Sequence, residues 1–249
     1  MTFTANTVRP AHKATPPRLD LYGPIHKALR HFMTDTLQRV GRLDVADAED
    51  VAATLRQVEA LLDVAASHLD HENEFMHPAI EACRPGTCER IAGEHVQHLQ
   101  AIAALRDDAR QLRATATPAG TLQLYRHLAR FVAENFEHMQ VEETVHNEAL
   151  WAHYTDAELK ALHDRLLASI PPAEMMLVLR WMVPALSPAE RGGLVKELRA
   201  ALAPVAFQAV LRTVRPHLDE AGWAKLAHAL GFVRAAFDVA HASECHASA

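Results

Sequence analysis

Histidine and glutamate residues at helical spacing are the part of this sequence that could do chemistry. Two His-x3-Glu pairs occur, and two further histidines stand on separate helical stretches. Side chains at positions i and i+4 lie on one face of a helix, so each pair could present an imidazole and a carboxylate to one point. Four imidazoles and two carboxylates in a bundle core would make a transition-metal site, best suited to two iron ions. The six candidate ligands are His26, His68, Glu72, His95, His138 and Glu142.

Four long helices must position these residues. Apolar periodicity predicts helices over about residues 24–40, 47–77, 88–113 and 121–152, separated by breaks at Gly41, residues 84–87 and residues 116–120. Such short connections favour an antiparallel bundle. The single histidines lie early in the first and third helices, and the pairs lie late in the second and fourth. In an up-down-up-down bundle these positions meet at the same end, so all six residues should lie at one level.

Composition restricts the fold class and the partners. The chain has 249 residues with 49% hydrophobic and 22% charged side chains and only 9 glycines, and strand patterning is absent, which predicts an all-α protein. A net charge of −6 argues against nucleic acid as a partner. No apolar run approaches the roughly 20 residues that a membrane span needs, and the N-terminus has no secretory pattern. Three cysteines do not make a disulfide framework, so we expect a cytoplasmic protein.

The expected organisation has four parts. Residues 1–20 form a flexible N-terminal arm, residues 21–154 the four-helix bundle, residues 155–240 a smaller helical C-terminal region, and residues 241–249 a tail. The sequences Thr155–Glu158 and Ser187–Glu190 are typical of capping boxes that start helices. The last helix is expected over Glu220–Val239. The C-terminal helices are the candidate surface for a protein partner or for self-association.

Three residues are open as additional or alternative ligands. His71 could compete with His68, and Glu143 could compete with Glu142. His98 follows His95 at i+3 on the same helix. An isolated histidine or an isolated His-x3-Glu pair is more often an ordinary surface feature, so the prediction depends on the whole set.

The six-residue pattern resembles the hemerythrin-like, or HHE cation-binding, domain over about residues 21–153. The matching stretches are Ile25–Leu29, His68–Pro78, Glu94–Leu99 and His138–Glu143, and the repeated His-x3-Glu is the specific element. The resemblance implies an antiparallel four-helix bundle of hemerythrin type. It also implies two non-haem iron ions, joined by an oxo or hydroxo bridge and by the carboxylates of Glu72 and Glu142.

One departure from the oxygen carriers of this family bears on function. Those proteins have His-x3-His on the third helix, whereas this chain has Leu99 at the second position. Either His98 replaces that ligand or one iron keeps an open position. We therefore expect binding or sensing of a small diatomic ligand, O2 or NO, or of redox or iron state. The alternatives are a di-iron enzyme of iron–sulfur repair or of peroxide or NO reduction, and an iron-responsive scaffold.

The sequence leaves open which metal binds and whether two of the cysteines form a redox pair. Zinc or manganese could occupy the same ligands, because the affinity order does not by itself select iron. Cys83 and Cys88 flank the turn at residues 84–87 without CxxC spacing. Two incidental thiols are favoured over a redox pair.

Overall fold

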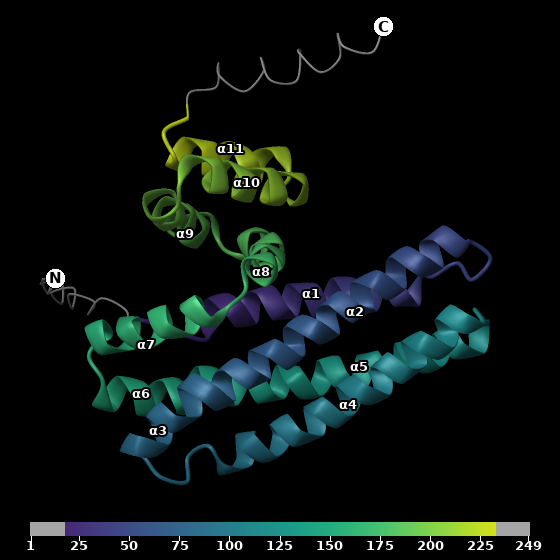
Figure 1. The fold of residues 1–249 in the computed structure, drawn as a ribbon, viewed down its shortest axis with the longest axis horizontal. Helices are drawn as coiled ribbons and strands as arrows, with labels where there is room; N and C mark the ends of the chain where they lie inside the picture. The colour runs from purple at the N-terminus through teal and green to yellow at the C-terminus, as the bar shows by residue number, and fades with distance from the viewer. Residues whose placement is uncertain (1–17, 233–249) are drawn as a thin grey trace, which may run out of the picture.

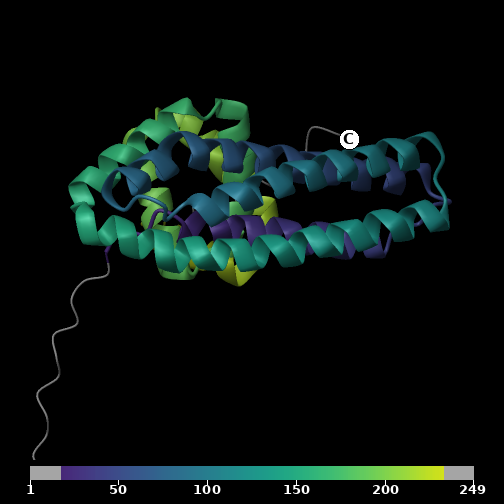
Figure 2. The same ribbon diagram turned by 90° about the horizontal axis from the view of Figure 1, so that it is seen from below.

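A computed structural model describes residues 18–232 of the chain as an assembly of helices, with no strand in that range. The expected all-α fold is thus confirmed. Its main body is a bundle of α1 (Gly23–Gly41), α2 (Ala48–His71), α4 (Glu89–Ala114) and α5 (Pro118–Val141). Helix α1 contacts α2 and α5, and α4 contacts the same two helices, which closes a four-membered ring. Consecutive bundle helices run in opposite directions, as Figures 1 and 2 show.

Local sequence explains where the bundle helices begin. The Asp47 side chain accepts hydrogen bonds from the backbone N–H groups of Glu49 and Asp50 at the start of α2. The Thr117 side chain caps α5 in the same way by accepting from the Gly120 N–H. This helix is expected to begin near residue 121, but α5 begins at Pro118. The difference arises because the capping residue Thr117 lies inside residues 116–120, which are expected to form a break.

Both helices that carry a His-x3-Glu pair contain a π-helical segment. Helix α2 continues through η1 (Glu72–Met76) into α3 (His77–Cys83), and α5 continues through η2 (Glu142–His146) into α6 (Asn147–His153). The expected end of the second helix before Pro78 is therefore wrong. Pro78 lies in the first turn of α3, where a missing N–H is tolerated, and the wider π turn precedes it.

The apolar core fills the bundle beyond the level of the histidines. Each helix contributes fully buried side chains, for example Phe32, Leu61, Leu105 and Phe131. Burying side chains of this size contributes about 1.5–3 kcal/mol each relative to leaving them exposed. The core thus holds the four helices at a fixed spacing. This spacing sets the distances between the histidines and glutamates at the other level of the bundle.

The C-terminal region packs against the outside of the bundle. It consists of α7 (Asp156–Ser169), α8 (Pro172–Ala185), α9 (Pro188–Ala201), α10 (Pro204–Val214), the 3-10 turn η3 (Arg215–His217) and α11 (Glu220–Ala229). The predicted capping boxes before α7 and α9 are confirmed. The last helix ends earlier than expected, near Gly231 with its φ of 72°, and residues 233–249 lie outside the described part of the chain.

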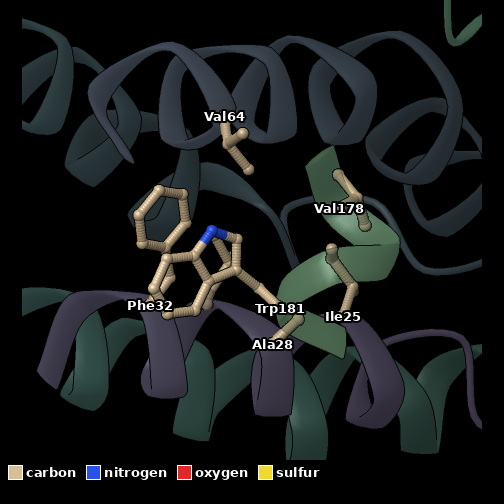
Figure 3. A pocket seen from close by; sticks show the side chains of 7 residues that line it. Ile25, Ala28, Phe32, Val64, Val178 and Trp181 are labelled. Atoms are coloured by element: carbon tan, nitrogen blue, oxygen red, sulfur yellow. The ribbon is translucent and has the colours of Figure 1, made fainter. Parts of the chain in front are cut away.

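Helix α8 makes the connection to the bundle by lying against α1 (Figure 1). The ring of Trp181 stacks on that of Phe32, with centroids 4.0 Å apart and planes at 12°, and Val64 of α2 faces the same pocket (Figure 3). Trp181 therefore packs into the apolar core of the bundle.

Where α6 ends and α7 begins, the Arg18 guanidinium donates hydrogen bonds to the carbonyls of Trp151 and Tyr154. The last residues of the expected arm are thereby held against the start of α7.

Among the described residues, no single helix is both long and apolar enough to span a membrane. Helices α7 and α8 pass that test only as a pair, by length and composition, and they are bent by 117°.

Candidate metal centre

The structure brings the six predicted residues together at one end of the bundle. Helix α1 supplies one histidine, α2 with η1 supplies a histidine and a glutamate, α4 supplies one histidine, and α5 with η2 supplies the second pair. Five of the six side chains are at most 3% exposed, and the His68 side chain is 13% exposed. The residues are His26, His68, Glu72, His95, His138 and Glu142.

The first group of ligand atoms combines two histidines with one oxygen from each glutamate. His68 Nε2 lies 3.2 Å from Glu72 Oε1, and His26 Nε2 lies 3.4 Å from Glu142 Oε2. The His26 Nε2 atom is also 3.8 Å from Glu72 Oε1. These four side chains could hold one metal ion.

The second group uses the other oxygen of each glutamate. His95 Nε2 lies 3.5 Å from Glu72 Oε2, and His138 Nε2 lies 3.4 Å from Glu142 Oε1. The two imidazole Nε2 atoms are 3.1 Å apart. With metal–ligand bonds of about 2.0–2.1 Å, neighbouring ligands are separated by about 2.9–3.4 Å, so the spacing suits a shared ion. Each carboxylate thus faces both groups, as a bridging ligand would.

The polar atoms of these groups lack protein partners. His26 Nε2, His68 Nε2 and all four oxygens of Glu72 and Glu142 are buried without a hydrogen bond from any described residue. Burying such groups unpaired costs several kcal/mol. Two cations, one in each group, would provide partners for all of these atoms, so the residues present fit a pair of metal ions.

The electrostatics of the metal-free cluster give the same indication. Burial and the neighbouring Glu142 raise the pKa of Glu72 to about 8. Burial lowers the pKa of His26, but Glu143 and Glu72 outweigh it and raise that pKa to about 9. Burial and the neighbouring His26 lower the pKa of His68 well below its ordinary value. Two carboxylates this close therefore need positive charge beside them, from protons or from metal ions.

Three of the imidazoles are oriented from behind by polar side chains. His26 Nδ1 lies 3.0 Å from Glu143 Oε1, and His138 Nδ1 lies 2.9 Å from Glu94 Oε2. Asn73 Oδ1 is 2.9 Å from the Nδ1 atom of His95. Such partners fix the ring orientation and the tautomer of a metal-binding histidine.

The structure also places the three residues that the sequence left open. Glu143 contacts the Nδ1 atom of His26 and the Arg30 guanidinium, and lies outside both groups. His98 is buried with its ring 4.8 Å from that of His138, but it joins neither group. His71 lies beside Phe75 and likewise joins neither group.

Sequence reasoning missed several residues at this end of the bundle. Glu94 and Asn73 reach imidazoles on other helices, which no local pattern indicates. The buried Tyr22 hydroxyl lies 3.4 Å from His146 Nδ1, and burial together with Glu72 and Glu142 raises its pKa. His146 follows Glu142 by four residues, a spacing that could have identified it as part of the same helix face.

Comparison with known proteins agrees with this arrangement. The family model described as the hemerythrin HHE cation binding domain matches residues 20–150, which is more than half of the chain. No curated protein and no solved structure matches the chain. On the match to the family model, the chain belongs to the hemerythrin HHE cation-binding domain family.

Proposed function

We propose that this protein holds two non-haem iron ions and uses them to bind and sense a diatomic molecule, O2 or NO. The observation that carries the proposal is the division of the carboxylate oxygens. Glu72 and Glu142 each direct one oxygen to the His26–His68 side and the other to the His95–His138 side. Histidine and carboxylate ligands in this number suit iron, which supplies reversible binding of small ligands when present.

Each ion would receive two imidazoles and two carboxylate oxygens from the chain. Non-haem iron sites with few protein ligands retain positions at which a small molecule can bind. The position at which oxygen carriers of the family have a second histidine is Leu99, whose side chain is 38% exposed. His98, the other candidate, lies outside both groups. These features favour open positions on the iron ions and a sensor over a carrier.

The chain's own residues would control the surroundings of that ligand. The apolar bundle core below the site excludes water, and the buried Tyr22 hydroxyl lies within the electrostatic influence of Glu72 and Glu142, which raise its pKa. Glu143, Asn73 and Glu94 hold three imidazoles in fixed orientations. A rigid site of this kind binds a ligand with little reorganisation.

Metal analysis and optical spectra test the proposal directly. The purified full-length protein should contain two iron ions per chain, and its spectrum should change on exposure to O2 or NO and return on removal of the gas. The Glu142→Ala variant should lose both ions, since Glu142 faces both groups, whereas His68→Ala should lose one. Unchanged iron content in both variants would overturn the ligand assignment. Consumption of O2, NO or peroxide over many turnovers would instead identify an enzyme.

A further inference from the structure

A third set of buried ligand-type side chains lies beside the two groups of the candidate metal centre. It consists of His77, Cys88 and His146, here called the His77 cluster, and its members expose 7%, 3% and 0% of their surface. The ligand atoms of the three residues all lie within 4.8 Å of one another. None of the three belongs to the His26–His68 or His95–His138 groups.

The π-helical segments bring the two histidines of the His77 cluster inward. His77 immediately follows η1, and its backbone N–H bonds to the carbonyl of Glu72, five residues earlier. Five residues of ordinary α-helix would turn His77 about 140° away from Glu72. The wider turn takes up the extra residue. His146 is the last residue of η2, so His77 and His146 lie one helical turn beyond Glu72 and Glu142.

The thiol of the cluster is held in place by the loop before α4. Cys88 is the residue that precedes this helix, and its backbone N–H donates to Glu81 Oε1 at 2.7 Å. The Gly86 N–H donates to the other Glu81 oxygen at 2.6 Å. Gly86 has a φ of 83°, a conformation that glycine adopts without strain. One carboxylate therefore fixes the loop and, with it, the position of the Cys88 side chain.

The imidazoles have free nitrogens that no described residue satisfies. His77 Nε2 and His146 Nε2 are buried and make no hydrogen bond of normal length and angle within residues 18–232, although the Thr87 backbone lies close enough to His146 to affect the pKa of its imidazole. The Nδ1 atom of His146 lies 3.4 Å from the Tyr22 hydroxyl, which leaves Nε2 as its ligand atom. A histidine that binds metal through one ring nitrogen typically forms a hydrogen bond of this kind, as His146 does with Tyr22, through the ring nitrogen that does not bind the metal.

We propose that the His77 cluster is a further metal site, for a borderline-soft divalent cation such as Zn²⁺. Imidazole nitrogen and thiolate sulfur are the donors that such ions prefer, and three protein ligands leave a fourth position open. Zinc–nitrogen bonds of about 2.0–2.1 Å and zinc–sulfur bonds of about 2.3 Å place tetrahedral ligands about 3.4–3.6 Å apart. The limit of 4.8 Å exceeds this by about 1 Å, which small side-chain rotations cover.

Binding at this site releases one proton from the thiol. Burial and the neighbouring Glu81 raise the pKa of Cys88 to about 12, so the metal-free side chain is a neutral thiol. The cation takes the sulfur lone pair and the proton leaves to solvent. The ring of His77 stacks on that of His95 with centroids 4.9 Å apart, so an ion here would also restrain a residue of the adjoining centre.

Co²⁺ is the probe that separates this site from the adjoining one. Cobalt bound by histidine and carboxylate has no thiolate absorption, whereas cobalt bound by Cys88 shows a thiolate-to-cobalt charge-transfer band in the near ultraviolet. The full-length protein, with and without iron, is titrated with Co²⁺ and the band is followed. In the iron-loaded form we expect the band to saturate at one equivalent. In the iron-free form the two other groups also take up Co²⁺, so we expect the band to reach the same final intensity only by about three equivalents.

Two variants assign the band to Cys88. Cys88→Ser should abolish it, with helical content and iron content checked by circular dichroism and elemental analysis. The double variant Cys83→Ser/Cys245→Ser leaves Cys88 as the only cysteine and should retain the full band. Absence of the band in the unmodified protein or in this double variant overturns the proposal, as does its persistence in Cys88→Ser. Retention in the double variant supports it even if Cys88→Ser does not fold.

Discussion

The hydrogen bond between Glu94 and His138 offers a test of how the metal centre is tuned. Glu94 lies on α4 and its Oε2 atom is 2.9 Å from Nδ1 of His138 on α5. Replacing Glu94 with Gln keeps the size of the side chain and an oxygen that can accept, but removes the negative charge. The imidazole then becomes a poorer metal ligand and is less firmly oriented.

The expected magnitude follows from the geometry. Loss of such a partner typically costs about 10–100-fold in metal affinity, and each tenfold step is about 1.4 kcal/mol. The Glu94 side chain is 23% exposed and Gln retains an acceptor, so we expect about a tenfold loss for Glu94→Gln and a larger one for Glu94→Ala. His138 contacts only the group that contains His95. One of the two ions should therefore weaken and the other should be unaffected.

Glu134 provides a matched control on the neighbouring helix. Arg90 with Glu94 and Arg130 with Glu134 are both i,i+4 pairs with an Nε–Oε1 distance of 2.7 Å. Within residues 18–232 no imidazole is hydrogen-bonded to Glu134, and the Glu134 side chain is 41% exposed. Glu134→Gln should therefore leave both ions as tightly bound as in the unmodified protein.

The assay is anaerobic competition between the Fe²⁺-loaded protein and a chelator, with iron release followed over time. Glu94→Gln should give two phases, of which only the faster one differs from the unmodified protein. The reasoning is refuted if Glu94→Gln and Glu134→Gln release iron identically, or if Glu94→Gln weakens both ions equally.

Three further predictions concern stability. Trp181→Ala should lower the free energy of unfolding by about 3–5 kcal/mol, because it removes a buried ring stacked on Phe32. The iron content should stay at two ions per chain. A loss below about 1 kcal/mol in a denaturant titration would contradict this packing role. Lys27 and Ser187 lower the pKa of Glu190 to about 2, below its value of about 4.3 in the unfolded chain. The ionised Glu190 therefore contributes its full stabilisation above about pH 4.3, and this stabilisation is lost as the pH falls towards 2. Glu190→Gln should thus lower stability by about 1 kcal/mol or less at pH 7, since the pair is exposed, and by nothing near pH 2; an equal effect at both pH values would exclude this origin. Chelation of iron should lower the melting temperature, because the buried carboxylates of Glu72 and Glu142 lose their counter-charges. At a free iron concentration 1,000-fold above Kd, binding at one site stabilises the folded state by about 4 kcal/mol. Calorimetry with and without a chelator measures the difference in melting temperature.

Much of the helical fold is predictable because its signals are local. Apolar periodicity and the capping residues Thr155 and Ser187 indicate where helices lie, and helix direction then places the six histidines and glutamates at one end. The errors occur where two local signals in the same segment favour different structures. Pro78 suggests a helix end, but a π turn ahead of it lets the helix continue. Residues 116–120 suggest a break, but Thr117 within them caps the next helix.

The sequence by itself determined the family, the helical fold and the set of residues that could bind metal. The i,i+4 spacing of His68 with Glu72 and of His138 with Glu142 depends only on helix geometry, so no tertiary information is needed. The tertiary structure alone decided which oxygen faces which of the other two imidazoles, because His26 reaches Glu142 and His95 reaches Glu72 from different helices. It also decided that Glu143 and Glu94 support histidines, and that His77, Cys88 and His146 meet. The meeting of these three depends on two π turns and on a loop held by Glu81, and spacing along the chain does not predict such contacts.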